Sequence, residues 1–230
     1  MTIIKQQDLI DSVADSLQYI SYFHPLDYIQ ALGEAYKAEQ SPAAKDAIAQ
    51  ILTNSRMCAE GHRPICQDTG IVVVFLKIGM NVRFEGTMAL DDMINEGVRK
   101  GYLDPDNKLR ASIVNDPAGK RLNTKDNTPA VIHIQMVPGD KLEIDIAAKG
   151  GGSENKAKFT MLNPSDSIVD WVIKTVPTMG AGWCPPGMLG IGIGGTPEKA
   201  MVMAKQSLME PIDMHELKKR GAKTRAEELR

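Results

Sequence analysis

The sequence predicts an α/β fold of the α+β type, in which several helices pack around a small mixed or antiparallel sheet. Three observations favour this class. Helical spacing of apolar residues dominates the first quarter of the chain, a β-branched apolar run follows, and two more strand-like segments come later. A chain of 230 residues is long enough to bury a core without disulfides or metals. Because we find no repeat or linker, the sequence predicts one domain over residues 1–230.

Apolar residues at helical spacing predict six helices. Ser41-Pro42 and Thr196-Pro197 are typical of an N-cap residue followed by proline at the first helical position. The predicted helices span residues 9–20, 25–36, 42–56, 88–101, 164–176 and 197–209. The charged end of the chain, 215–230, shows no cap and no apolar anchor.

Three segments read as strands. The run Ile71-Val-Val-Val-Phe-Leu-Lys-Ile78 indicates a buried strand because β-branched and aromatic residues fill it. Residues 130–137 and 141–148 flank Pro138-Gly139-Asp140, which predicts a hairpin between those two strands.

Composition excludes several classes of protein. The chain carries 27 basic and 29 acidic residues, so no global field recruits nucleic acid or an anionic membrane. Mean hydropathy is −0.22, and neither a membrane span nor a signal peptide is expected. Three cysteines at uneven spacing do not form a disulfide framework. We expect a cytoplasmic protein with reduced thiols.

Chemistry is expected in three glycine-rich or polar loops. The triplet Gly150-Gly-Gly152 suggests a turn whose free N–H groups bind a carboxylate or phosphate. A flexible connection is the alternative for that turn. Cys66 and Cys184 each lie in a loop of glycine, proline and polar residues, although a free cysteine is often only a small packed side chain. His62 is a further candidate because it precedes Cys66 by four residues.

Other residues give weaker signals. Gly190-Ile-Gly-Ile-Gly-Gly195 matches the spacing of a dinucleotide-binding turn, but the prolines before it are incompatible with the central strand that such a turn follows. Cys58 is expected to be an idle or packed thiol within the third helix. The remaining histidines, His24, His133 and His215, are expected to be ordinary structural or surface residues.

Four segments together resemble the N-terminal, iron–sulfur part of the class I fumarate hydratase and tartrate dehydratase family. They are Pro64-Ile-Cys-Gln-Asp-Thr-Gly70, Ala148-Lys-Gly-Gly-Gly-Ser-Glu-Asn-Lys156, Gly182-Trp-Cys-Pro-Pro-Gly187 and Ile193-Gly-Gly-Thr196. The resemblance implies a 4Fe–4S cluster, held by three cysteines, whose open iron acts as a Lewis acid. It also implies reversible hydration of fumarate to (S)-malate.

Carried over residue by residue, the resemblance makes Cys66 and Cys184 cluster ligands. It assigns the small dicarboxylate substrate to a second set of residues, which is Gln67, Asp68, Arg110, Gly150, Ser153, Asn155 and Lys156. An arginine suits this role because its planar fork pairs with a carboxylate through two parallel hydrogen bonds.

The resemblance also implies parts that these 230 residues do not contain. The family's third cluster cysteine and its catalytic base lie beyond residue 230, as does a swivelling C-terminal domain. We therefore expect this chain to be a truncated piece of the enzyme, inactive until the C-terminal domain or a beta subunit joins it. The complete enzyme is expected to be a homodimer.

Three alternatives remain open at this point. The chain could act on tartrate, since the motifs do not separate the two substrates. It could be a fragment without a cluster that binds anions or a partner. A nucleotide-dependent oxidoreductase would need measurable dinucleotide binding at the Gly190 loop.

Overall fold

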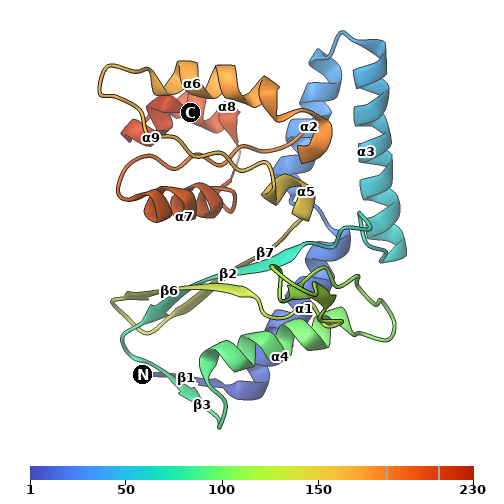
Figure 1. The fold of residues 1–230 in the computed structure, drawn as a ribbon, viewed down its shortest axis with the longest axis vertical. Helices are drawn as coiled ribbons and strands as arrows, with labels where there is room; N and C mark the ends of the chain where they lie inside the picture. Colours follow the sequence, from blue (N-terminus) through green and yellow to red (C-terminus); the bar gives the residue numbers. More distant parts are fainter. Residues whose placement is uncertain (185, 212) are drawn as a thin grey trace. The chain divides into compact units, whose positions relative to one another are not determined.

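The computed structural model describes residues 1–184, 186–211 and 213–230. The described chain combines helices with small sheets, which confirms the predicted α/β class of the α+β type (Figure 1). Contacts divide the chain into two compact units. The first contains residues 1–24 and 53–151, and the second contains residues 25–52 and 152–230. One boundary between the two units, after Leu52, lies inside helix α3 (Pro42–Gly61). A boundary within a helix has no linker composition, so the sequence does not reveal it.

The first unit holds the strands of the described chain, helices α1 and α4, and the end of α3. Its further elements are β1 (Thr2–Lys5), α1 (Gln6–Tyr22), β2 (Ile71–Gly79), β3 (Val82–Glu85), α4 (Leu90–Tyr102), β4 (Val114–Asn115), β5 (Leu122–Asn123), β6 (Val131–Val137) and β7 (Leu142–Lys149). The two strands β1 and β3 pair in parallel, and β4 pairs antiparallel with β5.

The main sheet is mixed, with strand order β6-β2-β7. Strand β2 runs parallel to β6, with Val74 opposite Ile132, and antiparallel to β7, with Val74 opposite Ile146. The predicted hairpin between β6 and β7 is therefore wrong, because β2 lies between them. The physical reason is burial: Val72 to Leu76 are all buried, and a strand paired on both edges suits such a run better than an edge strand does.

Helices α1 and α4 cover one face of this sheet and form the core of the first unit (Figure 1). Gly97 on α4 allows a close approach, because a Cβ there would lie 2.6 Å from Val13 Cβ and 2.8 Å from the carbonyl oxygen of Ile10. The core side chains come from α1, β2 and α4; they are Leu9, Ile10, Val13, Leu17, Val72, Val74, Leu76, Ile78, Met93, Ile94, Val98 and Tyr102, with Leu109 beside them. Each such aliphatic side chain contributes about 1.5 to 3 kcal/mol through burial.

The second unit is helical. It holds the first part of α3 together with α2 (Leu26–Ala38), α5 (Gly151–Glu154), α6 (Ile168–Thr175), the 3-10 helices η1 (Val176–Met179) and η2 (Ala181–Trp183), α7 (Pro197–Ser207), α8 (Met214–Arg220) and α9 (Arg225–Leu229). Helix α5 begins at Gly151, the last residue of the first unit. Among the described residues, no helix is long and apolar enough to cross a lipid bilayer.

Helix starts in the second unit depend on local caps. Helix α6 begins later than predicted because the Ser167 hydroxyl accepts a hydrogen bond from the Asp170 N–H. Helix α7 begins at Pro197 as predicted, but Thr196 does not cap it through its side chain, since that hydroxyl donates to Glu198 Oε1 at 2.6 Å.

The charged end of the chain forms two short helices that the sequence did not predict. Asp213 caps α8, and Thr224 caps α9. Arg220 binds Glu227 across the two helices, and this hydrogen bond, with one from the Lys223 N–H, lowers the pKa of Glu227 to about 2. Local caps and ion pairs therefore order this segment, and Leu217, which is buried, supplies the apolar anchor that the sequence did not indicate.

The Gly190 loop packs against helix α7. A Cβ on Gly190 would lie 2.0 Å from the carbonyl oxygen of Ala204, and one on Gly192 would lie 1.9 Å from that of Ala200. Only residues without a side chain allow the backbone to lie this close to a helix. The glycine spacing that matches a dinucleotide-binding turn is thus explained by packing within the second unit.

Candidate functional site

The Cys66 loop (residues 62–70) connects α3 to β2, and Ile65 anchors it just before Cys66. The Ile65 N–H donates to the carbonyl of Ser21 at 2.8 Å, and the Ile65 carbonyl accepts from Asn54 Nδ2 at 2.9 Å. The next two residues, Cys66 and Gln67, are exposed, and the Cys66 thiol donates to Gln67 Oε1 at 3.0 Å. The fold therefore presents this thiol and this amide on the surface of a fixed turn.

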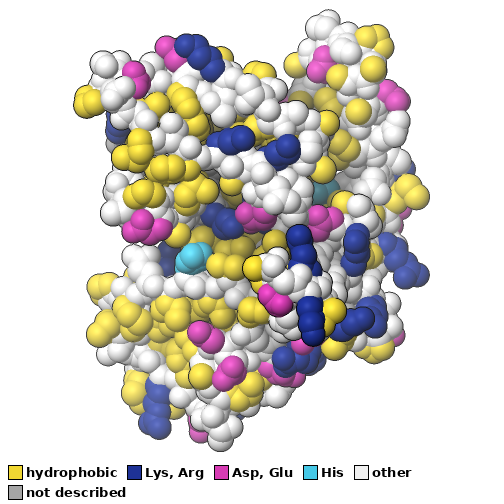
Figure 2. All heavy atoms as spheres, in the orientation of Figure 1, with side chains coloured by type: hydrophobic (Ala, Val, Ile, Leu, Met, Phe, Trp, Pro, Cys, Tyr) yellow, Lys and Arg dark blue, Asp and Glu magenta, His cyan; other side chains and the backbone are white. Residues whose placement is uncertain are grey.

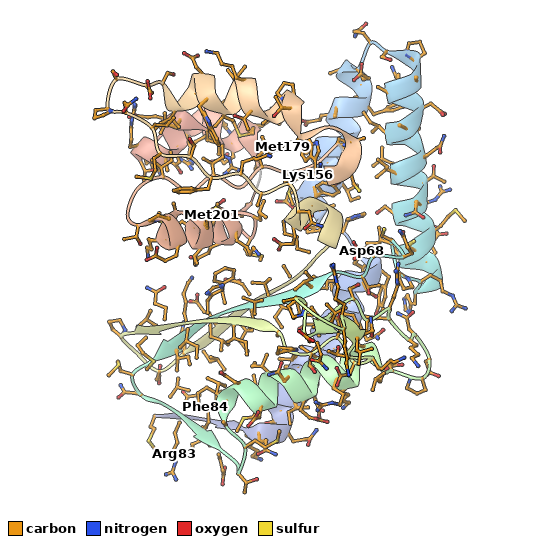
Figure 3. All side chains as sticks on the ribbon, in the orientation of Figure 1. Asp68, Arg83, Phe84, Lys156, Met179 and Met201 are labelled. Atoms are coloured by element: carbon orange, nitrogen blue, oxygen red, sulfur yellow. The ribbon has the colours of Figure 1, made fainter. Side chains whose placement is uncertain are left out.

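Asp68 joins the Cys66 loop to the glycine triplet (Figure 3). Its Oδ1 accepts from the Gly70 N–H at 3.2 Å, and its Oδ2 accepts from the Gly151 N–H at 2.9 Å. A Cβ on Gly150 would lie 3.1 Å from that same Oδ2. The glycine turn does bind a carboxylate through its backbone, and in this structure the carboxylate is that of Asp68.

Arg110 lies close to the same loop in the first unit. Its carbonyl accepts from the Thr69 hydroxyl at 2.6 Å. Its side chain is exposed and forms no hydrogen bond or ion pair with the residues that the structure describes. The segment around it carries further exposed basic residues, which are Lys108, Lys120, Arg121 and Lys125, and Figure 2 shows Lys and Arg side chains gathered over part of this face. The same segment also carries Asp104, Asp106 and Asp116, but none of them pairs with the Arg110 guanidinium, which is therefore available to an anion.

A partly buried set of hydrogen bonds connects the backbone of Arg110 to the Cys66 loop. We call this set the Gly70 junction. It consists of Thr69, Gly70, Tyr102, Asn127 and the backbone of residues 110–113. The Gly70 carbonyl accepts from the Tyr102 hydroxyl at 3.2 Å and from Asn127 Nδ2 at 3.0 Å. Tyr102 also donates to the Thr69 carbonyl at 2.7 Å. Sequence reasoning missed Tyr102 and Asn127, although Asn127-Thr128-Pro129 has turn composition that could have indicated a structured loop.

Tyr102 gives a testable dependence of stability on pH. Burial raises the pKa of its phenol to about 12, against a hydrogen bond to Thr69 that lowers it. The unfolded phenol ionises near pH 10, so it loses its proton before the folded one does. The contribution of the Tyr102 phenol to the free energy of unfolding is therefore complete below about pH 10 and is lost as the pH rises through about 12. The total loss is on the order of 2 to 3 kcal/mol.

Tyr102→Phe is expected to cost about 1 kcal/mol at neutral pH through the lost hydrogen bonds. The variant should also lack the part of the loss of stability at alkaline pH that ionisation of Tyr102 causes. Urea unfolding of both proteins at about pH 8 and about pH 11.5 measures the difference. An equal alkaline loss in the wild type and the variant would contradict the prediction.

In the second unit, the rest of the glycine loop lies against Gly182, two residues before Cys184. A Cβ on Gly152 would lie 2.9 Å from the Gly182 carbonyl oxygen, and one on Gly182 would lie 2.6 Å from Lys156 Cε. Lys156, labelled in Figure 3, forms no ion pair with the described residues. Glu154 pairs with Lys205 of α7 at 2.6 Å. Gly152 is therefore required by a backbone contact, and the Lys156 ammonium is available to an anion.

Each unit thus gathers a part of the residues predicted to form the site. The first unit brings together Cys66, Gln67, Asp68, Arg110 and Gly150, and the second holds Ser153, Asn155, Lys156 and Cys184. Asn155 is exposed, whereas Ser153 and Lys156 are half-buried.

The thiols test whether this chain suits an iron–sulfur cluster. Cys66 and Cys184 are both free and exposed, and thiolates are the ligands that such clusters take. Cys184 also has a left-handed backbone, with φ of 59°, a conformation that non-glycine residues adopt mainly where the structure requires it. Among the described residues, no group of three His, Cys, Asp or Glu side chains gathers as a metal site. Each unit therefore carries one exposed thiol of the chemical kind that such a cluster takes.

Cys58 and His62 have structural contacts of their own. Cys58 is buried, and its thiol is 3.6 Å from Asn54 Oδ1 and 3.7 Å from the Pro64 carbonyl oxygen, in agreement with the expected packed thiol. The His62 ring stacks on Tyr22 with centroids 4.7 Å apart.

Comparison with known proteins defines the chain as a member of a hydro-lyase family. A model described as fumarate hydratase (Fumerase) matches residues 10–230, nearly the whole chain, and the chain belongs to that family.

Relatives in the same family are named as tartrate dehydratase subunits. A Methanocaldococcus jannaschii protein, provisionally named L(+)-tartrate dehydratase subunit alpha, is 37% identical over 209 residues, covering 88% of this chain and 72% of that protein. The L(+)-tartrate dehydratase subunit alpha of Escherichia coli O157:H7 is 28% identical over 207 residues, covering 89% of this chain and 68% of that protein. These matches agree with the family that the loop motifs predict.

Proposed function

We propose that this chain is the cluster-binding part of a hydro-lyase that reversibly hydrates fumarate to (S)-malate. One observation carries the proposal: hydrogen bonds hold the backbone of Arg110, whose guanidinium has no partner among the described residues, to the turn that presents Cys66 and Gln67. A guanidinium on a fixed backbone, near an exposed amide, suits a small dicarboxylate. The family match supports the same reaction class.

On this proposal, Cys66 and Cys184 hold a 4Fe–4S cluster together with a third donor from outside these 230 residues. The cluster, when bound, supplies a Lewis acid for the oxygen that leaves or adds. Cys58 is not that third donor, because its thiol is buried against Asn54 and Pro64.

The chain's other residues bind and orient the substrate. Dehydration removes a proton from the carbon next to a carboxylate, and the negative charge that develops spreads onto the carboxylate oxygens. Arg110 pairs with one carboxylate in a bidentate manner and stabilises that charge. Gln67 donates its amide to the substrate's polar groups, and Lys156, with Ser153 and Asn155, contributes cationic and neutral donors. The base that takes the proton comes from outside this chain.

Asp68 and Gly150 have a more specific proposed role. Because Asp68 accepts from the Gly151 N–H, a substrate that binds this N–H requires Asp68 to exchange that bond for one to a substrate hydroxyl. A carboxylate only accepts hydrogen bonds when ionised, so Asp68 is matched to the hydroxyl of malate and not to its carboxylates.

The partner proposed for this chain is a beta subunit or an equivalent C-terminal domain. The relatives' names support it, since both are called alpha subunits. We place the assembled enzyme, a dimer of the complete unit, in the cytoplasm, because three free thiols and a cluster need a reducing compartment.

Tartrate is the second candidate substrate. The names of the two relatives favour it, and tartrate differs from malate by one hydroxyl group. The residues described above suit either dicarboxylate.

Kinetics of the intact complex test the proposal. A tagged chain is purified without oxygen from its native source, its partner is identified by mass spectrometry, and turnover of fumarate, malate and L(+)-tartrate is measured. We expect the highest kcat/KM with fumarate and malate. A higher kcat/KM with tartrate would select the second candidate. Absence of turnover by an iron-loaded complex with all three substrates would overturn both.

A further inference from the structure

Asn127 is a fully buried polar side chain at the Gly70 junction. It has no exposed surface, and its backbone is left-handed, with φ of 62°. Its Nδ2 donates to the Gly70 carbonyl at 3.0 Å, and its Oδ1 accepts from the N–H groups of Ser112 at 2.7 Å and Ile113 at 3.3 Å. A buried amide whose donor and acceptor join two separate loops fixes their relative position.

The two loops that Asn127 joins carry the proposed substrate contacts. Gly70 ends the loop that presents Gln67, and Ser112 follows Arg110 by two residues. A second bond, from the Thr69 hydroxyl to the Arg110 carbonyl at 2.6 Å, joins the same loops nearer the surface. Two attachments at different depths prevent one loop from rotating about the other.

Helix α4 holds Asn127 itself in place. The neighbouring Asp126 accepts from Arg99 Nε of α4 at 3.0 Å and from the Thr128 N–H at 3.0 Å. Tyr102, one turn further along α4, donates to the same Gly70 carbonyl that Asn127 binds. The Gly70 junction is therefore held in place by a helix of the core and not by another surface loop.

We propose that Asn127 is a positioning residue that sets the distance between Arg110 and Gln67, and thereby the length of dicarboxylate that the site accepts. This inference rests on the proposed function of the site. A displacement of about 1 Å far from the chemistry can cost about 100-fold in rate, so a change in this separation should be visible in substrate selection.

Two variants separate positioning from stability. Asn127→Asp keeps the size and the acceptor oxygen, and aspartate tolerates the left-handed backbone, but an oxygen replaces the donor to Gly70. Asn127→Gly keeps the backbone conformation and removes all three hydrogen bonds. Val98→Ala is the control, because Val98 lies buried on α4 and its truncation loosens the same core without removing any hydrogen bond of the junction.

The measurement uses the anaerobically purified complex. The KM of the four-carbon substrate is determined, together with inhibition constants for malonate, succinate and glutarate, three dicarboxylates that differ only in length. Both Asn127 variants are expected to raise KM about tenfold, the effect of weakening one hydrogen bond to a charged group. They should also reduce the preference for succinate over the shorter and longer acids by a similar factor. Val98→Ala should lower the melting temperature and leave KM and this preference unchanged.

The outcomes distinguish the inference from the function on which it rests. Wild-type complex that neither turns over nor binds any of these dicarboxylates would overturn both. Normal length preference in folded Asn127 variants would overturn the inference alone. Failure of both Asn127 variants to fold, with Val98→Ala folded, would assign Asn127 to stability and would likewise overturn it.

Discussion

Cys66→Ser is expected to abolish stable cluster binding and to lower the activity of the complex by at least about 100-fold, since even changes next to metal ligands cost 10- to 100-fold. Cys184→Ser should behave in the same way. Both thiols are free and exposed, and a serine hydroxyl does not provide the soft thiolate that iron–sulfur clusters require. Iron and acid-labile sulfide, counted per chain after anaerobic reconstitution with the partner, measure the loss independently of activity.

Cys58→Ser is the matched control for these two variants. Its thiol is buried and directed at Asn54 Oδ1 and the Pro64 carbonyl, both of which a serine hydroxyl can also bind. We expect normal iron and sulfide content, with a small loss of stability. Full cluster content in Cys66→Ser and Cys184→Ser would contradict the ligand assignment. Absence of iron and sulfide from the wild-type complex would favour the cluster-free, anion-binding alternative.

Arg110→Ala is expected to lower kcat/KM for the dicarboxylate by about 100- to 1000-fold, equivalent to about 3 to 4 kcal/mol of transition-state interaction. Arg110→Lys should recover only part of this loss, because an ammonium keeps the charge but not the bidentate fork. Stability should change by no more than about 0.5 kcal/mol, since the side chain is exposed and has no partner among the described residues. Steady-state kinetics and urea unfolding of the same preparations separate the two effects.

Lys108→Ala is the control for general electrostatic attraction. Lys108 is exposed on the same segment, two residues before Arg110. Its loss should reduce kcat/KM by a factor of less than about three, and the reduction should disappear at high salt because exposed charges are screened. Equal effects of Lys108→Ala and Arg110→Ala would show that the basic surface, and not one guanidinium, attracts the substrate.

Secondary structure was predictable wherever one short pattern determined it. The helices near Leu9 and Met93 and the strand beginning at Ile71 were found because each buries one continuous apolar stripe or run. The pairing of the strands was not predictable in the same way. The turn at Pro138 to Asp140 indicated a hairpin, but strand order depends on which strand is buried on both faces, and that is a property of the whole sheet.

The residues of the candidate site also differ in whether a local pattern reveals them. Cys66 could be selected from the composition of its loop, whereas Gln67 and Arg110 were assigned through the resemblance of their segments to the family. Asn127 could not be selected in either way, because its structural role depends on hydrogen bonds to residues 14, 15 and 57 positions away in the chain. Asp68 was selected as a substrate contact, and only the structure shows that its carboxylate already binds the Gly151 N–H.

The sequence by itself determined the α/β class, the positions of the main helices, the glycine-rich loops and the family to which they belong. Local periodicity and backbone freedom are encoded over a few residues, so a linear reading recovers them. The tertiary structure alone decided that β2 separates β6 from β7, that Gly190 and Gly192 serve packing against α7, and that a buried asparagine joins the loops of Gly70 and Arg110. These features arise from burial and hydrogen bonding between distant segments, which exist only once the chain has folded.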